Sequence, residues 1–325
     1  MDKEEKNVEM VYMAPYMKSV IEKLMVEKKR PAVHTYNATL NSFTEFSGIQ
    51  GTEEMPVTEV FTSGKLKEYE IWLRNRNASW NTVSTYMRVL KAVYNRLVED
   101  EYLNYNAKLF EDVYTKVEAQ TKRSLTEEQM NTLLRTDFEK LPKDIQYALA
   151  YFLLMFLFRG MPFIDLAYLR KQDLKGNCIT YCRHKTGKKM VVRIPKEATA
   201  LFEKCRNKKN DSGYLFPILD ETAENDKKLY ENYRQALRTF NRKLARVAVL
   251  LLPDAKISSY TARHTWATLA FYSGIPIGII SKALGHSSIK VTETYLKPFE
   301  NEKVDAANDE LIMSVTNRLE GKKVA

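Results

Sequence analysis

Helical periodicity runs through almost the whole of this 325-residue chain and gives way to a β pattern in one short stretch. Apolar residues near the start recur at steps of three and four, as on one face of a helix: Met17, Val20, Ile21 and Leu24. The β stretch comprises 178–184 and 190–194, which are rich in β-branched and aromatic residues and flank the turn Lys185-Thr-Gly-Lys-Lys. This arrangement is typical of a hairpin. The sequence therefore predicts a mainly α protein with a small β-hairpin or sheet.

The chain is too long for one typical domain, and two domains are expected. We assign residues 1–15 to a flexible tail, 16–110 to a helical N-terminal domain, 111–123 to a polar linker and 124–325 to a second domain. The second domain is mostly helical, contains the hairpin and ends in an amphipathic helix. Ser124 or Thr126 is expected to cap its first helix, because acidic residues follow in the first turn.

The formal net charge of +10 favours a polyanionic partner, although many basic proteins bind no nucleic acid specifically. The longest apolar run, Ile145 to Phe158, is shorter than the ~20 residues needed to cross a bilayer. The N-terminal residues MDKEEKNVEM lack the apolar core of a signal peptide. We therefore expect a cytoplasmic protein with no membrane partner.

Cys178, Cys182 and His184 recur at even spacing and would share one face of a strand. A structural zinc site needs a second pair of ligands, and the sequence offers none nearby. We therefore interpret these residues as strand residues that pack on a core, and we predict no metal site and no cofactor.

Two sets of basic residues are candidates for binding DNA. No acidic residue occurs between Ile71 and Val98, where cations alternate with aromatic residues: Arg74, Arg76, Arg88, Lys91 and Arg96. A second set repeats every four residues along one helix face: Arg234, Arg238, Arg242 and Arg246. Mixed cations and aromatic residues suit contact with phosphates and sugars. For each set taken alone, a solvated helix face is the alternative interpretation.

The most specific signal lies near the C-terminus. Tyr260-Thr-Ala-Arg263-His264 is followed by Leu284-Gly285-His286, and Tyr295 comes nine residues after His286. This series resembles the tyrosine recombinase (phage integrase) family, whose catalytic domain has a His-x-x-Arg box and a Leu-Gly-His box followed by a tyrosine nucleophile. Lys185 in the hairpin turn is similar to the family's active-site lysine, and the segment 158–169 resembles the one that holds its first arginine.

The resemblance extends over residues 125–300 and implies a site-specific DNA recombinase of the integrase or invertase kind. Such an enzyme cleaves and rejoins DNA strands through a 3′-phosphotyrosine intermediate. The helical N-terminal domain would be the family's core DNA-binding domain. The implied partner is double-stranded DNA with specific recombination sites, bound by a homotetramer in the nucleoid. Whether accessory DNA-bending proteins take part stays open.

The chemistry can also be derived from the residues. A phosphodiester resists attack because its anionic oxygens repel nucleophiles, so an enzyme without a metal must supply cations that hold these oxygens. We expect Arg263 to do so, with His286 as a further donor. Tyr295 is the expected nucleophile, and Lys185 is the expected acid that protonates the leaving 5′-oxygen. His264 is expected to face away from the site as a core histidine.

Two positions depart from the family pattern. Tyr260 replaces the first histidine of the His-x-x-Arg box, and a phenol can donate or accept a hydrogen bond but cannot become a cation. If Asp165 is the acid that usually follows the first arginine, the arginine position holds Pro162. We assign the missing role to Arg159, one turn earlier. Asp165 would orient a catalytic cation or simply be a first-turn acid. Three arginines are further candidates: Arg170, Arg183 and Arg193.

Two alternative functions share the expected fold. A type IB topoisomerase-like enzyme would relax DNA without bringing two sites together, and a catalytically silent relative would only bind DNA. An RNA-binding helical protein is a third possibility, but the sequence contains no RNA-recognition motif.

Overall fold

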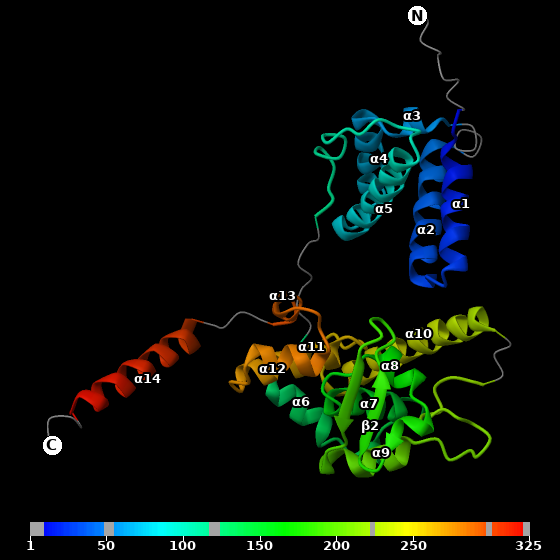
Figure 1. Ribbon diagram of the computed structural model, residues 1–325. Coiled ribbons are helices and arrows are strands. Elements are labelled where there is room, and N and C mark those ends of the chain that lie inside the picture. Colours follow the sequence, from blue (N-terminus) through cyan, green and yellow to red (C-terminus); the bar gives the residue numbers. More distant parts are fainter. Residues whose placement is uncertain (1–9, 49–54, 117–123, 222–224, 297–300, 321–325) are drawn as a thin grey trace, which may run out of the picture. The chain divides into compact units, whose positions relative to one another are not determined.

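The computed structural model describes residues 10–48, 55–116, 124–221, 225–296 and 301–320 (Figure 1). The chain divides into two compact units, residues 1–120 and 121–325. Within the described residues, no helix is both long and apolar enough to cross a membrane.

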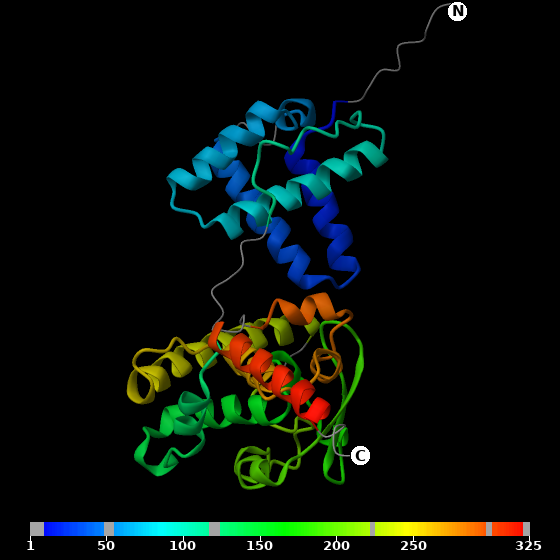
Figure 2. The ribbon, with the colours of Figure 1, turned by 90° about the vertical axis from the view of Figure 1, so that its left-hand side faces the viewer.

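The regular elements in the described part of unit 1 are helices, with one isolated β-bridge between Tyr12 and Pro56. The helices are α1 (Met13–Val26), α2 (Arg30–Ser47), α3 (Val57–Val60), α4 (Ser63–Asn75) and α5 (Trp80–Glu99). Helices α1 and α2 lie side by side (Figure 1, Figure 2). Thr62 and Ser79 begin α4 and α5 as N-caps, because each hydroxyl accepts a hydrogen bond from a main-chain N–H in the first turn.

Unit 1 extends beyond the expected boundaries at residues 15 and 110. Met13 and Ala14, which were assigned to the tail, are buried in helix α1. Val113 belongs to the same buried cluster, and the main-chain N–H of Tyr114 donates to the buried carboxylate of Glu70 at 2.5 Å. Residues 1–9 of the expected tail and 117–123 of the expected linker lie outside the described residues.

Unit 2 is built around α7 (Lys143–Leu157), whose apolar side chains are nearly all buried. Helices α9 (Thr199–Cys205), α10 (Asp226–Leu251) and α11 (Thr261–Tyr272) pack against it. The remaining helices are α6 (Glu127–Leu134), α8 (Phe163–Tyr168), α12 (Ile277–Leu284), α13 (Ile289–Glu293) and α14 (Asn301–Glu320), with 3-10 turns at Phe138–Lys140, Lys171–Asp173 and Lys196–Ala198. Of the two expected caps, Thr126 begins α6, in a capping box with Gln129.

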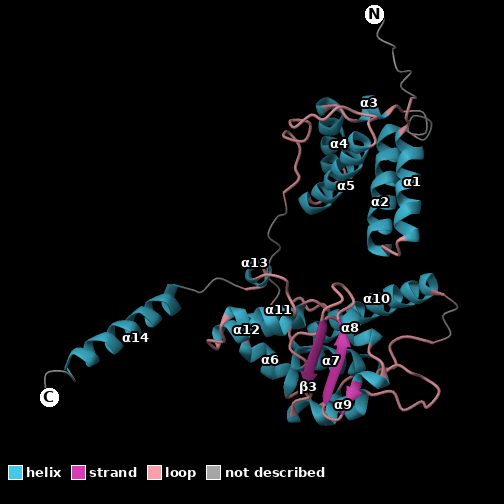
Figure 3. Cartoon of the chain, viewed as in Figure 1, coloured by secondary structure: helices cyan, strands magenta, loops and turns pink. Residues whose placement is uncertain are grey.

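The mainly α fold with a small sheet is confirmed (Figure 3). Strands β2 (Cys178–Cys182) and β3 (Lys189–Arg193) pair antiparallel with Thr180 opposite Val191, as the hairpin pattern predicts. A short strand that the sequence did not predict, β1 (Leu174–Lys175), pairs with β2 and makes a three-stranded sheet. Ile179 and Tyr181 point into the core. Cys178 and Cys182 lie on the other face of β2, so the expectation that they pack on a core was wrong.

Candidate active site

Helix α11 carries Arg263, which is 4% exposed although its guanidinium group is charged. Its Nη1 donates to the carbonyl oxygen of Gly160 at 2.9 Å, and its Nη2 donates to that of Leu284 at 2.6 Å. Leu284 ends α12, so its carbonyl has no partner within that helix. Gly160 has φ +68°, and a Cβ there would lie 3.1 Å from the Cα of Arg263. The glycine therefore permits the close approach that fixes this arginine.

His286 is held between Arg263 and Thr292. Nη2 of Arg263 lies 3.0 Å from Nε2 of His286, and the histidine Nδ1 lies 2.9 Å from Oγ1 of Thr292. Because arginine can only donate, Nε2 accepts, and Nδ1 carries the proton that is donated to Thr292. Burial lowers the pKa of His286 to about 4. Four neighbouring cations act in the same direction: Arg263, Arg183, Lys188 and Lys185.

A second guanidinium group, that of Arg183, extends from the end of strand β2 to the end of α12, where Arg263 also binds. Arg183 is 8% exposed, and its Nη1 donates to the carbonyl oxygens of Leu284 at 3.1 Å and Gly285 at 3.0 Å. Gly285 has φ +66°, and a Cβ there would lie 2.9 Å from Cδ of Arg183. Burial, and then the charge of Arg183, lowers the pKa of Arg263. The positively charged side chains of Arg183 and Arg263 thus both bind carbonyl oxygens at the end of α12.

Asp165 on α8 is the carboxylate beside this pair. Its Oδ1 accepts a hydrogen bond from the main-chain N–H of His184 at 2.9 Å, and its Oδ2 lies 3.6 Å from Nε of Arg183. Within the described residues neither Oδ2 nor that Nε has a hydrogen-bond partner, so the two atoms face each other across a gap slightly too long for a hydrogen bond. Burial raises the pKa of Asp165 in spite of the nearby N–H and arginine charges.

Arg159, the residue predicted to supply the missing cation, lies away from this cluster. Its backbone has φ +60°, and its exposed side chain reaches the carbonyl oxygen of Val191 on β3 at 3.5 Å. It lines a separate cavity of about 440 Å³ together with Arg193. Arg170 pairs with Glu221 at 2.8 Å. Of the four candidate arginines, the structure therefore brings Arg183 to Arg263.

Tyr295 follows α13 and lies against the same cluster. Its ring centroid is 4.9 Å from that of His286 and 5.6 Å from Cζ of Arg263. Thr292 and Leu296 on either side of it are buried, while Tyr295 itself is half-buried. Helix α11, the end of α12 and α13 therefore bring together Arg263, His286 and Tyr295, the expected nucleophile.

Two further side chains from α11 and its N-cap contact Tyr295. The ring of Tyr260 lies parallel to that of Tyr295, with centroids 6.5 Å apart and an interplanar angle of 16°. Desolvation by the packed rings, followed by the charge and hydrogen bond of Tyr295, raises the pKa of Tyr260 to about 12, although the residue is 54% exposed, so Tyr260 is a neutral phenol at physiological pH. His264 does not face away as expected. Its ring stacks on Tyr295 at 4.6 Å.

The hairpin turn presents Lys185 and Lys188, both exposed. Nζ of Lys188 donates to the carbonyl oxygen of His286 at 3.3 Å, a contact that was not predicted from the sequence. Lys185 is close enough for its charge to help lower the pKa of His286. The hairpin thus adds two ammonium groups to the two guanidinium groups.

The basic residues predicted to contact DNA lie on α4, α5 and α10, apart from Arg76, which directly follows α4. Two of them stack on tryptophans, Arg74 on Trp80 with Cζ 4.4 Å from the ring centroid and Arg76 on Trp72 at 4.6 Å. Several others are exposed on their helices: Arg88, Lys91, Arg238 and Arg242. Arg96 and Arg234 are half-buried. Arg76 and Arg246 already pair with carboxylates of the chain, Glu45 and Asp144.

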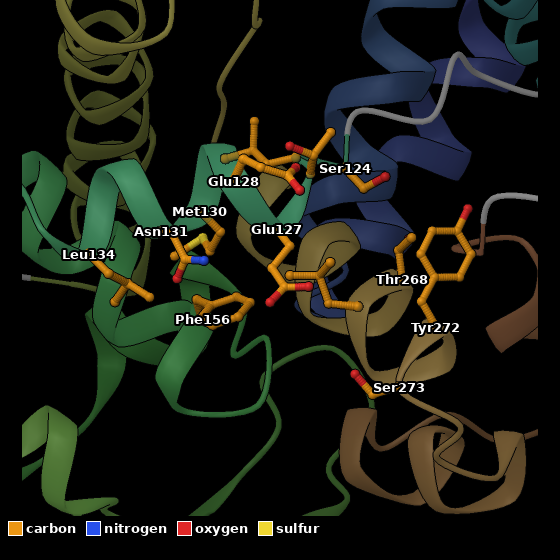
Figure 4. A pocket seen from close by; sticks show the side chains of 13 residues that line it. Ser124, Glu127, Glu128, Met130, Asn131, Leu134, Phe156, Thr268, Tyr272 and Ser273 are labelled. Atoms are coloured by element: carbon orange, nitrogen blue, oxygen red, sulfur yellow. The ribbon is translucent and has the colours of Figure 1, made fainter.

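A cavity of about 620 Å³ lies between α6 and α11, outside the cluster around Arg263 (Figure 4). Its lining includes Glu127 and Glu128 from α6 and Tyr272 from α11. Thr268, which also lines it, donates through Oγ1 to the carbonyl oxygen of Tyr295 at 3.4 Å. Within the described residues, no cluster of His, Cys, Asp or Glu side chains could hold a metal ion.

One signal in the sequence could have identified Arg183. Ile179, Tyr181 and Arg183 alternate along β2 and its continuation, and all three are buried. A charged residue that continues the buried face of a strand needs buried partners, which points to a special role. The contact of His264 with Tyr295 had no comparable signal.

Two family models match this chain. The model of the phage integrase family matches residues 123–302, and that of the phage integrase SAM-like domain matches residues 13–113. Among curated proteins, the chain is similar to tyrosine recombinase XerA of Pyrococcus furiosus, with 27% identity over 229 residues that cover 69% of this chain and 72% of the relative. It is also similar to transposase B from transposon Tn554 of Staphylococcus aureus, at 27% identity over 68% of this chain and 35% of that longer protein.

Solved structures show the same fold. The integrase of transposon Tn1549 in complex with a circular intermediate DNA aligns with a TM-score of 0.64 at 16% identity, covering 93% of this chain and 100% of that one. A lambda integrase tetramer bound to a Holliday junction aligns with a TM-score of 0.62 at 15% identity, covering 90% and 78%. At these identities the likeness concerns the fold.

Proposed function

This chain belongs to the phage integrase family, and from that premise we propose how its residues divide the work of cutting and rejoining DNA. Members of the family are tyrosine recombinases, so the chain is an enzyme that transfers DNA strands. The observation that carries the assignment of residues is the meeting of Arg263, Arg183 and Tyr295 at the end of α12.

We assign the two phosphate-binding arginines to Arg263 and Arg183, in place of Arg159. Each guanidinium group uses some of its donors on carbonyl oxygens, and five donors per arginine leave others for the non-bridging oxygens of a phosphodiester. The carbonyl oxygens hold both cations in position before DNA binds, so little reorganisation is needed when charge develops. Asp165 positions Arg183 by facing its Nε.

Tyr295 is the nucleophile of this proposal. Its phenolic oxygen attacks phosphorus and forms the P–O bond of a 3′-phosphotyrosine, while the bond from phosphorus to the 5′-oxygen breaks. The phenol proton leaves to solvent, and Lys185 donates a proton to the departing 5′-oxygen. Tyr260 is the hydrogen-bond donor beside the phenol, because its raised pKa keeps its hydroxyl protonated. His286 orients Arg263 by accepting its hydrogen bond.

The substrate of this reaction is double-stranded DNA with specific recombination sites. Recombination joins two duplexes with two sites of cleavage each, which requires four copies of the chain. The exposed cations of α5 and α10 are suited to phosphate contacts, which fix orientation without reading sequence. The lambda integrase tetramer on a Holliday junction has the same fold and supports this assembly.

The test uses duplexes taken from the DNA that flanks the gene, each with a nick next to the bond to be cleaved; we call them nicked flank duplexes. The nick lets the short fragment with the 5′-hydroxyl leave after cleavage, which traps the covalent adduct. Wild-type protein is expected to form an SDS-resistant covalent complex, and Tyr295→Phe is expected to bind the DNA but form none. Tyr272→Phe, a tyrosine change in the same unit, is the control and should form the adduct. A normal yield from Tyr295→Phe would overturn the assignment.

Two further arms separate the related functions. Cleavage should persist in EDTA, because guanidinium and ammonium groups supply the positive charge that a metal would otherwise supply. A relaxing enzyme of the type IB topoisomerase kind would change the supercoiling of a plasmid that lacks the sites, whereas a recombinase requires two of them. A silent DNA-binding relative would give no adduct on any flank.

A further inference from the structure

We propose that His264 is a positioning residue that holds the nucleophile Tyr295 at a set distance from the phosphate-binding arginine. The inference rests on the proposed function for the identity of the nucleophile. Arg263 and His264 are adjacent residues of one helix, and they contact the same tyrosine in different ways.

The His264 ring supports the Tyr295 ring. Their centroids are 4.6 Å apart and their planes differ by 29°, which is the geometry of an offset stack. The ring of Tyr260 lies 5.7 Å from that of His264, so the three aromatic side chains form one group. A tyrosine ring that rests on a neighbouring ring has fewer positions for its hydroxyl than one that projects into solvent.

Helix α11 also holds the main chain of Tyr295. Nδ1 of His264 lies 3.5 Å from the carbonyl oxygen of Tyr295, and Oγ1 of Thr268, one turn further along, donates to that oxygen at 3.4 Å. The helix is itself fixed, because the main-chain N–H of Leu125 donates to Oγ1 of Thr265 at 3.0 Å. Arg263, His264 and Thr268 all lie on α11, so one helix carries both the arginine and the support for Tyr295.

This arrangement sets the quantity on which in-line attack depends, the distance between the attacking oxygen and phosphorus. Misplacement of a reacting group by about 1 Å can cost about 100-fold in rate. If the stacked ring is what matters, His264→Phe should cleave nicked flank duplexes at close to the wild-type rate. His264→Asn keeps a nitrogen near the position of Nδ1 but lacks the ring, and it should lose about 10- to 100-fold, as should His264→Ala. The Kd for DNA should not change in any of them.

A surrogate nucleophile separates positioning of Tyr295 from damage to the phosphate site. In Tyr295→Phe, added hydrogen peroxide can attack phosphorus as the hydroperoxide anion. A P–O bond forms, the bond to the 5′-oxygen breaks, and Lys185 supplies the proton. His264→Ala in the Tyr295→Phe background should leave this peroxide-dependent rate unchanged, because the cations are intact. An equal fall in the peroxide rate would show that His264 acts on the phosphate site and would overturn the proposal.

A readout without DNA keeps the inference separate from the proposed function. With 13C-labelled tyrosine rings, the Tyr295 resonance is identified by its loss in Tyr295→Phe. His264→Ala should shift that resonance by removing the ring current of the stacked imidazole, while His264→Phe should keep it in a ring-current-shifted position. Absence of a shift in His264→Ala would refute the stack even if no flank DNA is cleaved. A wild-type protein that shows the shift but forms no adduct would refute the proposed function alone.

Discussion

Arg183 and Arg263 both donate hydrogen bonds to the carbonyl oxygen of Leu284, at 3.1 Å and 2.6 Å, although 80 residues separate them in the sequence. The C-terminal end of a helix carries partial negative charge and unpaired carbonyl oxygens. That end can therefore hold two like charges together in a buried place.

Removal of Arg183 should abolish most of the activity. Arg183→Ala is expected to cut the single-turnover cleavage rate by about 10²- to 10³-fold, the typical effect of losing one donor to a developing oxyanion. Arg183→Lys should recover part of the loss, because a point charge replaces a forked donor. The control is Arg159→Ala, which should cleave nicked flank duplexes at nearly the wild-type rate. The opposite ranking of Arg159 and Arg183 would restore the assignment made from the sequence.

Gly285 should be required for cleavage because it has no side chain, in addition to any requirement for its positive φ angle. Gly285→Ala places a methyl group 2.8 Å from Sδ of Met190 and 2.9 Å from Cδ of Arg183, so it should displace the arginine and slow cleavage. The matched control is Gly274→Ala, because Gly274 also has positive φ, +77°, but open space around a Cβ. Both variants should lose roughly 1–2 kcal/mol of stability from backbone strain. Comparable cleavage by the two variants would contradict the steric argument.

Lys185 should matter only while the leaving group needs a proton. Lys185→Ala should be slow on ordinary DNA, and replacement of the bridging 5′-oxygen by sulfur should restore much of its cleavage rate, because a thiolate leaves without protonation. Lys189→Ala, on the adjoining strand, should show neither defect nor rescue. If sulfur relieves Lys185→Ala no more than wild type, another group is the acid, and Lys188 beside His286 is the next to test.

The pKa of His286 should make stability depend on pH in a defined direction. Its pKa is lowered to about 4 from the ordinary 6.5, so the unfolded chain binds the proton more readily than the folded chain. The resulting stabilisation is complete above pH 6.5 and is lost as the pH falls towards 4. Urea unfolding of wild type and His286→Gln should therefore give a stability difference that shrinks between pH 7 and pH 5. A constant difference would mean that His286 titrates alike in both states.

The sequence predicted the parts of the molecule that depend on local spacing. The helical periodicity, the hairpin and the Thr126 cap all rest on neighbours within a few positions, and each is present. The position of Arg159 away from the Arg263 cluster could not be predicted, because it depends on one backbone angle, φ +60°, just after the end of α7.

The position of His264 was expected wrongly for a similar reason. On an isolated helix adjacent residues point about 100° apart, so His264 is expected to face away from the site when Arg263 points into it. The segment that carries Tyr295 crosses α11 and contacts both residues, an arrangement set by tertiary packing over 31 positions.

The burial of Thr292 and Leu296 on either side of Tyr295 has a consequence for stoichiometry. Tyr295 lies within the same unit as Arg263 in a single chain, so we expect every copy to cleave with its own tyrosine. A mixture of Tyr295→Phe and Arg263→Ala copies should then be as inactive as either alone, because no pairing of the two reunites a tyrosine with its arginine. In mixtures with wild type, the number of cuts should fall in simple proportion to the fraction of inactive copies.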